Sequence, residues 1–354
     1  VLALAALRGV SRSRAAQGAL AGRALLLLGQ TIRVYGPDGA DHLGRYAARV
    51  LHQPEPLHLA IHLGGPVRAN RKPVVALLDA TGDLLGYAKL GVTPLARTLV
   101  RNERAALRTL GDAGLRRLRI PRLRHGGVWS GHELIIQSAL PVVGPSLPDP
   151  ELVTRAMCEL ARACGSQRAR LTDAPYWLAL LARADRTGDP RLAEALTLVR
   201  HHDGGSYLEY GAWHGDWTPW NSHPAGDAVL LWDWERFGLG VPVGFDALHH
   251  RLAELLQRGA AEPLPALLAE APSLLAPFGR QPFGLAPAQA RTTAGLYLIE
   301  IATRYLTDDQ QTTAARTVTD DLLPALTAHF TSPAAPDPAP SLAAESGRTP
   351  GGDR

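Results

Sequence analysis

Two aspartates and an asparagine lie in two short segments that are rich in tryptophan. Asp216 and Asn221 are five residues apart in "WHGDWTPWN", and Asp233 lies in "LLWDWERFGLG". An aspartate can accept a proton from a hydroxyl group. A carboxylate and an amide oxygen together can hold a hard cation such as magnesium. This combination of groups is what phosphoryl transfer from a nucleotide requires.

A lysine and a glutamate earlier in the chain belong to the same pattern. Lys89 ends the apolar segment "LLGYAK", which alternates like a strand. Glu103 shares a face with Leu99 and Leu107 on the helix predicted over residues 93–111. A buried carboxylate needs a partner, and Lys89 is the obvious one. Each residue alone has an ordinary structural explanation, but the ordered set of Lys, Glu, Asp-x4-Asn and Asp is hard to explain by chance.

The ordered set resembles the aminoglycoside phosphotransferase-like family of the protein-kinase-like superfamily, over roughly residues 58–330. His214-Gly215-Asp216, with Asn221 five residues later, matches the catalytic loop of that family, and Asp233-Trp234-Glu235 matches its metal loop. The resemblance implies an α+β fold with two lobes. A small N-lobe would hold an antiparallel sheet with one key helix, and a larger C-lobe would be mainly helical.

The resemblance also implies ATP and Mg²⁺ as cofactors and a role for each residue. Asp216 would take the proton of the acceptor hydroxyl, while Asn221 and Asp233 would bind magnesium. Lys89 would contact the ATP phosphates and would be held by Glu103. The remaining implied residues are Ser138 and Ala139 at the interlobe hinge near the adenine, and His214 and Asp246, which organise the catalytic loop.

The segment that should cover the phosphates departs from the protein-kinase pattern G-x-G-x-x-G. The chain has "LGGPVRANRKPVV" there. Backbone amides at Gly64 and Gly65 can still surround a phosphate, so we predict both as nucleotide-binding residues. Lys72 and the two nearby arginines can add positive charge, although the sequence does not tell which of them faces the nucleotide.

The tryptophans have two explanations. Trp213 and Trp232 are predicted to pack in the core, the latter because "VLLWDW" alternates like a buried strand. Trp217, Trp220 and Trp234 either pack beneath the loops or form an apolar wall around the acceptor. For Trp217 the two explanations are equally good.

Changes in pattern along the chain predict four segments. Residues 1–44 form a helical extension, 45–139 the nucleotide-binding N-lobe, 140–331 the catalytic and acceptor-binding C-lobe, and 332–354 a disordered tail. No apolar run is long enough to cross a membrane, and the two cysteines are predicted to be buried thiols, so we predict a cytoplasmic location.

Charge is divided unevenly along the chain. Residues 1–128 carry 20 basic and 7 acidic residues, and the remainder carries 17 and 26. The densest basic run, residues 116–125, has no interleaved aromatic residue, so a solvated connector is favoured over a nucleic-acid site. In the acidic half, Glu300 shares a helix face with Tyr297 and is a candidate for binding a substrate ammonium group.

These observations predict an ATP- and Mg²⁺-dependent phosphotransferase that acts on a hydroxyl of a small molecule, with an amine-bearing acceptor such as an aminoglycoside as the narrower prediction. Three alternatives stay open. The first is a kinase of another alcohol, such as a sugar, an amino alcohol or a modified peptide. The second is a nucleotide-binding regulatory module without turnover, and the third is a nucleic-acid-binding protein.

Overall fold

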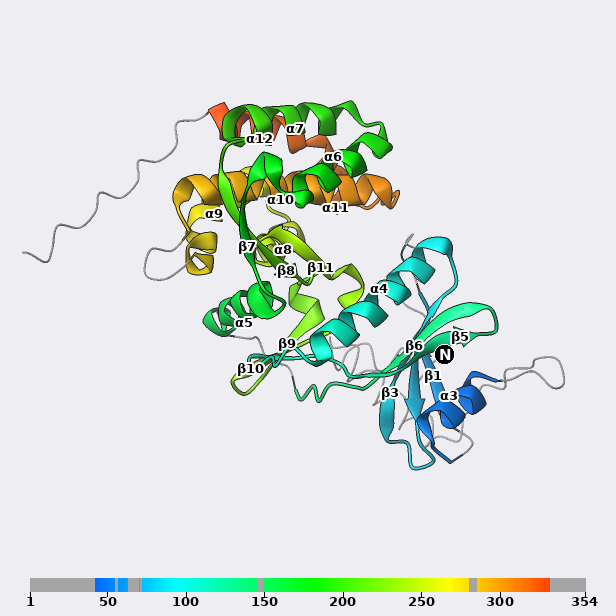
Figure 1. Ribbon diagram of the computed structural model, residues 1–354. Helices are drawn as coiled ribbons and strands as arrows, with labels where there is room; N and C mark the ends of the chain where they lie inside the picture. Colours follow the sequence, from blue (N-terminus) through cyan, green and yellow to red (C-terminus); the bar gives the residue numbers. More distant parts are fainter. Residues whose placement is uncertain are drawn as a thin grey trace, which may run out of the picture.

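The computed structural model describes residues 42–54, 57–62, 70, 72–144, 149–279 and 285–331. These residues form a smaller lobe rich in strands and a larger lobe rich in helices, as Figure 1 shows. Most of the predicted helical extension, the predicted disordered tail, and both Gly64 and Gly65 lie outside the described residues.

The smaller lobe is built on a five-stranded antiparallel sheet with the order β1-β2-β3-β6-β5. The strands are β1 (His58–His62), β2 (Val74–Leu78), β3 (Leu84–Gly91), β5 (Leu123–Trp129) and β6 (His132–Gln137). Both predicted hairpins are present. Gly82 turns between β2 and β3 with φ 87°, and Ser130 and Gly131 turn between β5 and β6 with φ 47° and 78°. Positive φ is typical of tight hairpin turns.

Two helices cover this sheet. Helix α3 (Leu43–Leu51) buries leucine and alanine side chains in a small core that it shares with β2, β3 and β6. Helix α4 (Pro94–Gly111) packs against β3 and β6 and begins as predicted, because the Thr93 hydroxyl accepts a hydrogen bond from the Ala96 backbone N–H at 3.1 Å. Helix α4 is the one key helix of the predicted N-lobe.

The larger lobe contains most of the helices, and its core is continuous with the inner face of α4. Asp149 and Asp189 cap α5 and α7, as their Asp-Pro pairs predict. The long α10 buries nearly every residue from Ala290 to Thr303, so it runs through the centre of the lobe. The helices are α5 (Pro150–Ala163), α6 (Pro175–Thr187), α7 (Pro190–Asp203), α8 (Phe245–Gln257), α9 (Pro263–Leu275), α10 (Pro287–Thr307), α11 (Thr313–Asp320) and α12 (Leu322–Thr331).

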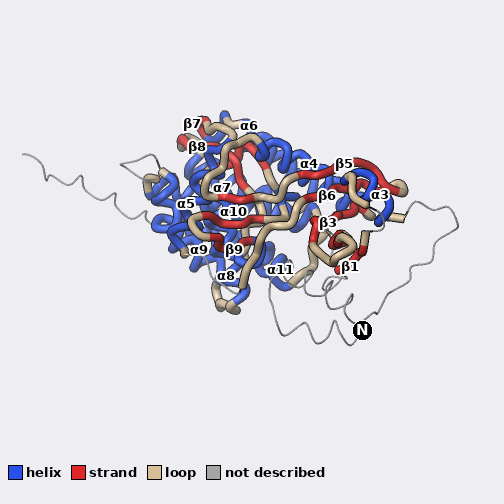
Figure 2. Tube along the Cα trace, turned by 90° about the horizontal axis from the view of Figure 1, so that it is seen from below, coloured by secondary structure: helices blue, strands red, loops and turns tan. Residues whose placement is uncertain are grey.

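Two small sheets lie in this lobe, and Figure 2 shows their strands among the helices. One sheet pairs β4 (Leu118–Arg119) with β10 (Ala228–Leu231) and β9 (Ser222–Ala225). The other pairs β11 (Gly238–Pro242) with β8 (Tyr207–Trp213) and β7 (Gln167–Arg170). The segment that carries the predicted catalytic residues connects the two sheets.

Three details of the sequence analysis are wrong. Strand β10 ends at Leu231, because its pairing with β9 stops there, so Trp232 lies outside the strand and is only half-buried. Cys164 is exposed, since α5 ends at Ala163 and leaves Cys164 at its cap, and Cys158 is half-buried. Neither thiol is therefore fully enclosed.

The arginines of the basic run are exposed to solvent. Arg116, Arg117, Arg119, Arg122 and Arg124 are all exposed, while the apolar residues between them face inward in whole or in part. In the described part of the chain, no helix is both long and apolar enough to cross a membrane.

Candidate active site

The hairpin formed by β9 and β10 brings Asn221 and Asp233 to the same end. Asn221 precedes β9, Asp233 follows β10 by two residues, and the last paired residues are Ser222 and Leu231. The Trp232 backbone N–H donates to the Asn221 carbonyl at 3.1 Å, which continues the pairing beyond the strands. Asp233 then adopts a left-handed conformation, with φ 72°, at the start of the short helix η4 (Trp234–Arg236). The two predicted metal ligands therefore come from adjacent positions of one hairpin.

The turn before Asp216 is held by a buried carboxylate. The backbone N–H groups of His214 and Gly215 donate to Asp246 at 2.7 and 3.1 Å. Burial raises the pKa of Asp246 to about 7, although these two hydrogen bonds act to lower it. Gly215 has φ 80°, and a Cβ atom there would lie 2.2 Å from the Arg236 carbonyl oxygen, so this turn requires glycine.

His214 organises the loop from the other side. Its Nδ1 accepts a hydrogen bond from the Asp216 backbone N–H at 3.1 Å, so its Nε2 carries the proton and donates to the Trp232 carbonyl at 3.1 Å. Burial lowers the pKa of His214 to about 4, which keeps the ring neutral in this arrangement. The structural roles predicted for His214 and Asp246 fit these contacts.

Asp216 is anchored at both carboxylate oxygens. The Asn221 amide donates to Oδ2 at 3.0 Å and to the Asp216 carbonyl oxygen at 2.9 Å. Oδ1 lies 3.2 Å from the His249 Nε2. Burial acts to raise the pKa of Asp216, but the hydrogen bond from His249 and the charge of Arg304 outweigh it, so the pKa is lowered. One third of the side chain remains exposed, which leaves an ionised base open to solvent.

Lys89 joins the two lobes. Its Nζ lies 2.5 Å from Glu103 on α4 and 2.8 Å from Asp233 in the larger lobe. Both Lys89 and Glu103 are buried, as the helix periodicity predicts for Glu103. Burial disfavours the charge on Lys89, but its ion pairs with Asp233 and Glu103 outweigh this effect and raise its pKa. Lys89 is therefore a fixed positive charge beside the predicted metal ligand.

A second lysine enters the same cluster. The Lys72 ammonium group contacts Glu235 and lies 3.4 Å from Asp233. Burial lowers the pKa of Lys72, against the raising effect of Asp233. Among the described residues, oxygen atoms of Glu103, Asp233 and Glu235 come within 4.8 Å of one another, which is a spacing that could hold a metal ion. Sequence reasoning named Lys72 only as one of three cations, and it did not connect that lysine with Glu235.

The side-chain oxygens of Asn221 and Asp233 are suitable ligands for magnesium. Carbonyl and carboxylate oxygens only accept hydrogen bonds, so the Asn221 nitrogen must face Asp216, and its Oδ1 faces away from that residue. An amide oxygen from Asn221 and a carboxylate from Asp233 are hard ligands, and magnesium takes only one or two protein carboxylates. Asn221 and Asp233 would hold the ion together with phosphate oxygens.

The predicted hinge follows β6. The Ser138 backbone N–H donates to the Arg122 carbonyl at 2.9 Å, and the Arg122 backbone N–H donates to the Ser138 hydroxyl at the same distance. These bonds fix Ser138 against the strand beside it. Ser138 and Ala139 are half-buried, and their contact with adenine stays a prediction.

Trp217 and Trp234 do not form the wall of a cleft. Trp217 and Trp234 are fully buried, and Trp213 is buried as well. The ring of Trp234 packs edge-on against His214 with centroids 4.6 Å apart. Trp220 is half-exposed. Trp217 and Trp234 therefore support the catalytic loop from below, which explains why aromatic residues are concentrated around the two aspartates.

The ammonium-binding role considered for Glu300 is wrong. Glu300 is buried and pairs with Arg183 at 2.5 Å and with the Tyr176 hydroxyl at 3.2 Å. Its charge is thus already matched inside the lobe. Since α10 is buried on nearly all sides, the face that carries Glu300 contacts other helices and not an open surface.

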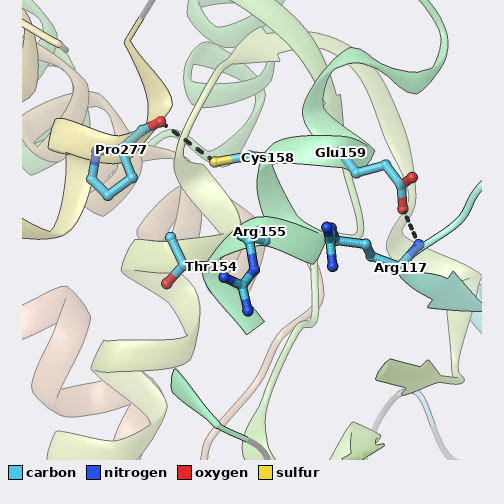
Figure 3. Close-up of a pocket in the computed structure, with 6 residues that line it drawn as sticks. All are labelled: Arg117, Thr154, Arg155, Cys158, Glu159 and Pro277. Atoms are coloured by element: carbon cyan, nitrogen blue, oxygen red, sulfur yellow. Dashed lines mark hydrogen bonds between the residues drawn. The ribbon is translucent and has the colours of Figure 1, made fainter. Parts of the chain in front are cut away.

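A separate hollow of about 430 Å³ lies beside α5, and Figure 3 shows the side chains around it. Glu159 in this hollow accepts hydrogen bonds from the backbone N–H groups of Arg116 and Arg117. Burial raises the pKa of Cys158, so that thiol is a poor nucleophile. None of the predicted site residues lines the hollow, which is lined by Arg117, Thr154, Arg155, Cys158, Glu159 and Pro277.

Comparison with known proteins identifies the fold. No family model and no curated protein matches the chain. A thermostable mutant of aminoglycoside phosphotransferase APH(4)-Ia, in a ternary complex with ADP and hygromycin B, superposes with a TM-score of 0.51 at 12% identity, covering 82% of this chain and 99% of the other. The chain has the fold of the protein-kinase-like phosphotransferases. A candidate fructosamine-3-kinase from Haemophilus somnus 129PT has the same TM-score at 11% identity, covering 81% of this chain and 96% of the other.

Several residues that sequence reasoning missed lie around Asp216. His249 on α8 and Tyr297 on α10 form a buried chain that ends at its carboxylate. Arg304 donates to the Gly215 carbonyl, and Arg236 pairs with Asp308. The spacing of Asp246 and His249 was a usable signal, since residues three apart share a helix face.

Proposed function

We propose that this chain transfers the γ-phosphate of ATP to a hydroxyl of a small molecule, with Mg²⁺ as the metal. The observation that carries this proposal is the hairpin of β9 and β10, which links two sets of side chains. At Asp233 lie Lys89 and Glu103, and at Asn221 lies Asp216. This proximity supports a phosphate donor and a hydroxyl acceptor in adjoining positions.

Each side chain has a role in the proposed reaction. Lys89 binds the nucleotide phosphates, while Asp233 and Asn221 hold magnesium, which neutralises phosphate charge when bound. Asp216 orients the acceptor hydroxyl and takes its proton as the oxygen attacks phosphorus. Its lowered pKa keeps the carboxylate ionised, and its two anchored oxygens limit its rotation.

An amine-bearing acceptor, such as an aminoglycoside, is the narrower proposal. Its support is the excess of acidic over basic residues after residue 128, which attracts cations over a distance. Glu300 gives it no support, because that carboxylate is paired with Arg183. Another alcohol, such as a sugar, an amino alcohol or a modified peptide, is the alternative acceptor.

The test is magnesium-dependent ADP release with a panel of aminoglycosides, sugars and amino alcohols. The wild type should release ADP fastest with one acceptor class. Asp216→Asn should lower kcat by on the order of 10²-fold or more, while MgATP affinity from calorimetry stays the same. A regulatory module would bind MgATP but would release no ADP with any acceptor. A wild type that MgATP does not stabilise against heat would refute the proposal, because a ligand of the native state must stabilise it.

A further inference from the structure

The two oxygens of Asp216 have partners of different origin. Asn221, which contacts Oδ2, belongs to the catalytic loop itself. His249, which contacts Oδ1 at 3.2 Å, lies on α8 and is buried. No part of the nucleotide or metal chemistry requires a histidine at this position, so its contact with the base needs its own explanation.

The direction of the hydrogen bonds around His249 follows from charge. An ionised carboxylate can only accept, so the His249 Nε2 must carry the proton. Burial lowers the pKa of His249, which keeps the ring neutral and makes Nδ1 an acceptor. The Tyr297 hydroxyl lies 2.9 Å from Nδ1, and burial raises the pKa of Tyr297, so this hydroxyl keeps its proton and donates it. The chain of donors runs from Tyr297 to His249 to Asp216.

The packing around this chain fixes its geometry. Tyr297 is fully buried on α10, and its ring contacts Phe245 of α8 edge-on with centroids 5.7 Å apart. The rings of His249 and Tyr297 are also edge-on, at 6.1 Å. Both helices are held in the main core of the larger lobe. His249 therefore has little freedom to leave Asp216.

We propose that His249 is a positioning residue for the base, with Tyr297 fixing its tautomer, so that the Asp216 carboxylate is held in the orientation that receives the acceptor hydroxyl. This inference rests on the proposed function. His249 takes no proton in the reaction, because its Nε2 already carries one. The proton of the hydroxyl ends on Asp216, whose exposed part remains open to the acceptor.

The test compares two variants of His249 that differ in one property. His249→Gln keeps an N–H donor near Oδ1, and His249→Leu removes it. The probe is MgATP with water as the acceptor, read as ADP release. Loss of a hydrogen bond to a charged group predicts a fall in kcat of about 10- to 100-fold for H249L, with an unchanged KM for MgATP. H249Q should retain most of the rate, and Tyr297→Phe should lower kcat by less than H249L does.

A purely structural role of His249 predicts a different effect of H249L on kcat when Asp216 is already replaced by Asn. Positioning predicts that H249L lowers kcat no further once the carboxylate is gone, whereas a structural role predicts the same additional loss. Nitrogen NMR of histidine-labelled protein adds a readout without turnover, since the signal lost in H249L should be that of a neutral ring protonated at Nε2.

The outcomes separate the two proposals. Wild-type protein that releases no ADP from MgATP with water or with any acceptor of the panel removes the proposed function and this inference with it. Full turnover in H249L removes the inference alone, as does a further loss in the Asp216→Asn background or a ring protonated at Nδ1.

Discussion

Removing the lysine that joins the lobes should destabilise the protein far more than neutralising its glutamate partner. The cluster contains two lysines and three carboxylates, so it carries one net negative charge: Lys72, Lys89, Glu103, Asp233 and Glu235. Lys89→Met would raise this to two negative charges, in a place where Glu103 is fully buried. Breaking a buried ion pair by removing one partner costs about 3–5 kcal/mol. That is a large part of the total free energy of unfolding of a typical domain.

Glu103→Gln removes a negative charge from a cluster that has one in excess. Only one oxygen of Glu103 contacts Lys89, and among the described atoms its Oε2 has no hydrogen-bond partner. The glutamine carbonyl can still accept from Lys89, which also keeps its contact with Asp233 at 2.8 Å. The expected cost is that of one weakened hydrogen bond, about 1 kcal/mol.

Urea unfolding near neutral pH, first with a chelator and then with Mg²⁺, measures both variants. The double variant K89M/E103Q should recover part of the stability lost in K89M, because the neutral glutamine no longer places an unpaired charge in the core. Magnesium should stabilise K89M more than the wild type, since a cation replaces the missing ammonium group. Equal losses in K89M and E103Q, or a K89M variant as stable as the wild type, would show that the cluster is not an electrostatically coupled unit.

Three further predictions concern the loops. Asp233→Ala should abolish the magnesium-dependent part of ATP binding in calorimetry, and an unchanged magnesium dependence would exclude Asp233 as a ligand. Burial lowers the pKa of His214 from 6.5 to about 4, so protonation favours the unfolded state and stability should fall by up to about 3 kcal/mol as pH drops through that window. His214→Asn, whose Oδ1 can replace Nδ1 as acceptor, should flatten this dependence in urea unfolding, and parallel curves would contradict it. Gly215→Ala should lower both Tm and kcat, because its Cβ would overlap the Arg236 carbonyl. The control variant Gly240→Ala, with φ 71° and open space, should cost only the backbone strain of about 1 kcal/mol. Equal losses of Tm in the two variants would refute the overlap.

The fold and the main chemical groups were predictable because they depend on local patterns. Alternation and turn residues define the strands of the smaller lobe, and helix periodicity places Glu103 on a buried face. A buried carboxylate needs a partner, and the preceding strand offers one lysine at its end. The contact between Lys89 and Glu103 follows from these facts without any knowledge of the larger lobe.

Contacts between distant segments were not predictable in the same way. Lys72, two residues before β2, meets Glu235 of η4 across the lobes, and no sequence period encodes that approach. Trp217 lies in a loop, where no period distinguishes a buried side chain from an exposed one. Glu300 was misread for a different reason. A buried carboxylate needs a partner, and this requirement pointed to Lys89 as the partner of Glu103. The same requirement applies to Glu300, because its helix is buried on nearly all sides. Its partner inside the lobe is Arg183.

The positions of the base and of the two lobes are set by the same short segment. Asp233 pairs with Lys89 of the smaller lobe, and the residue before it, Trp232, is hydrogen-bonded both to the Asn221 carbonyl and to the His214 ring. Asn221 and His214 are in turn the residues that fix Asp216. A displacement of Asp233 would therefore also move Asp216, because Trp232, Asn221 and His214 connect the two aspartates through hydrogen bonds.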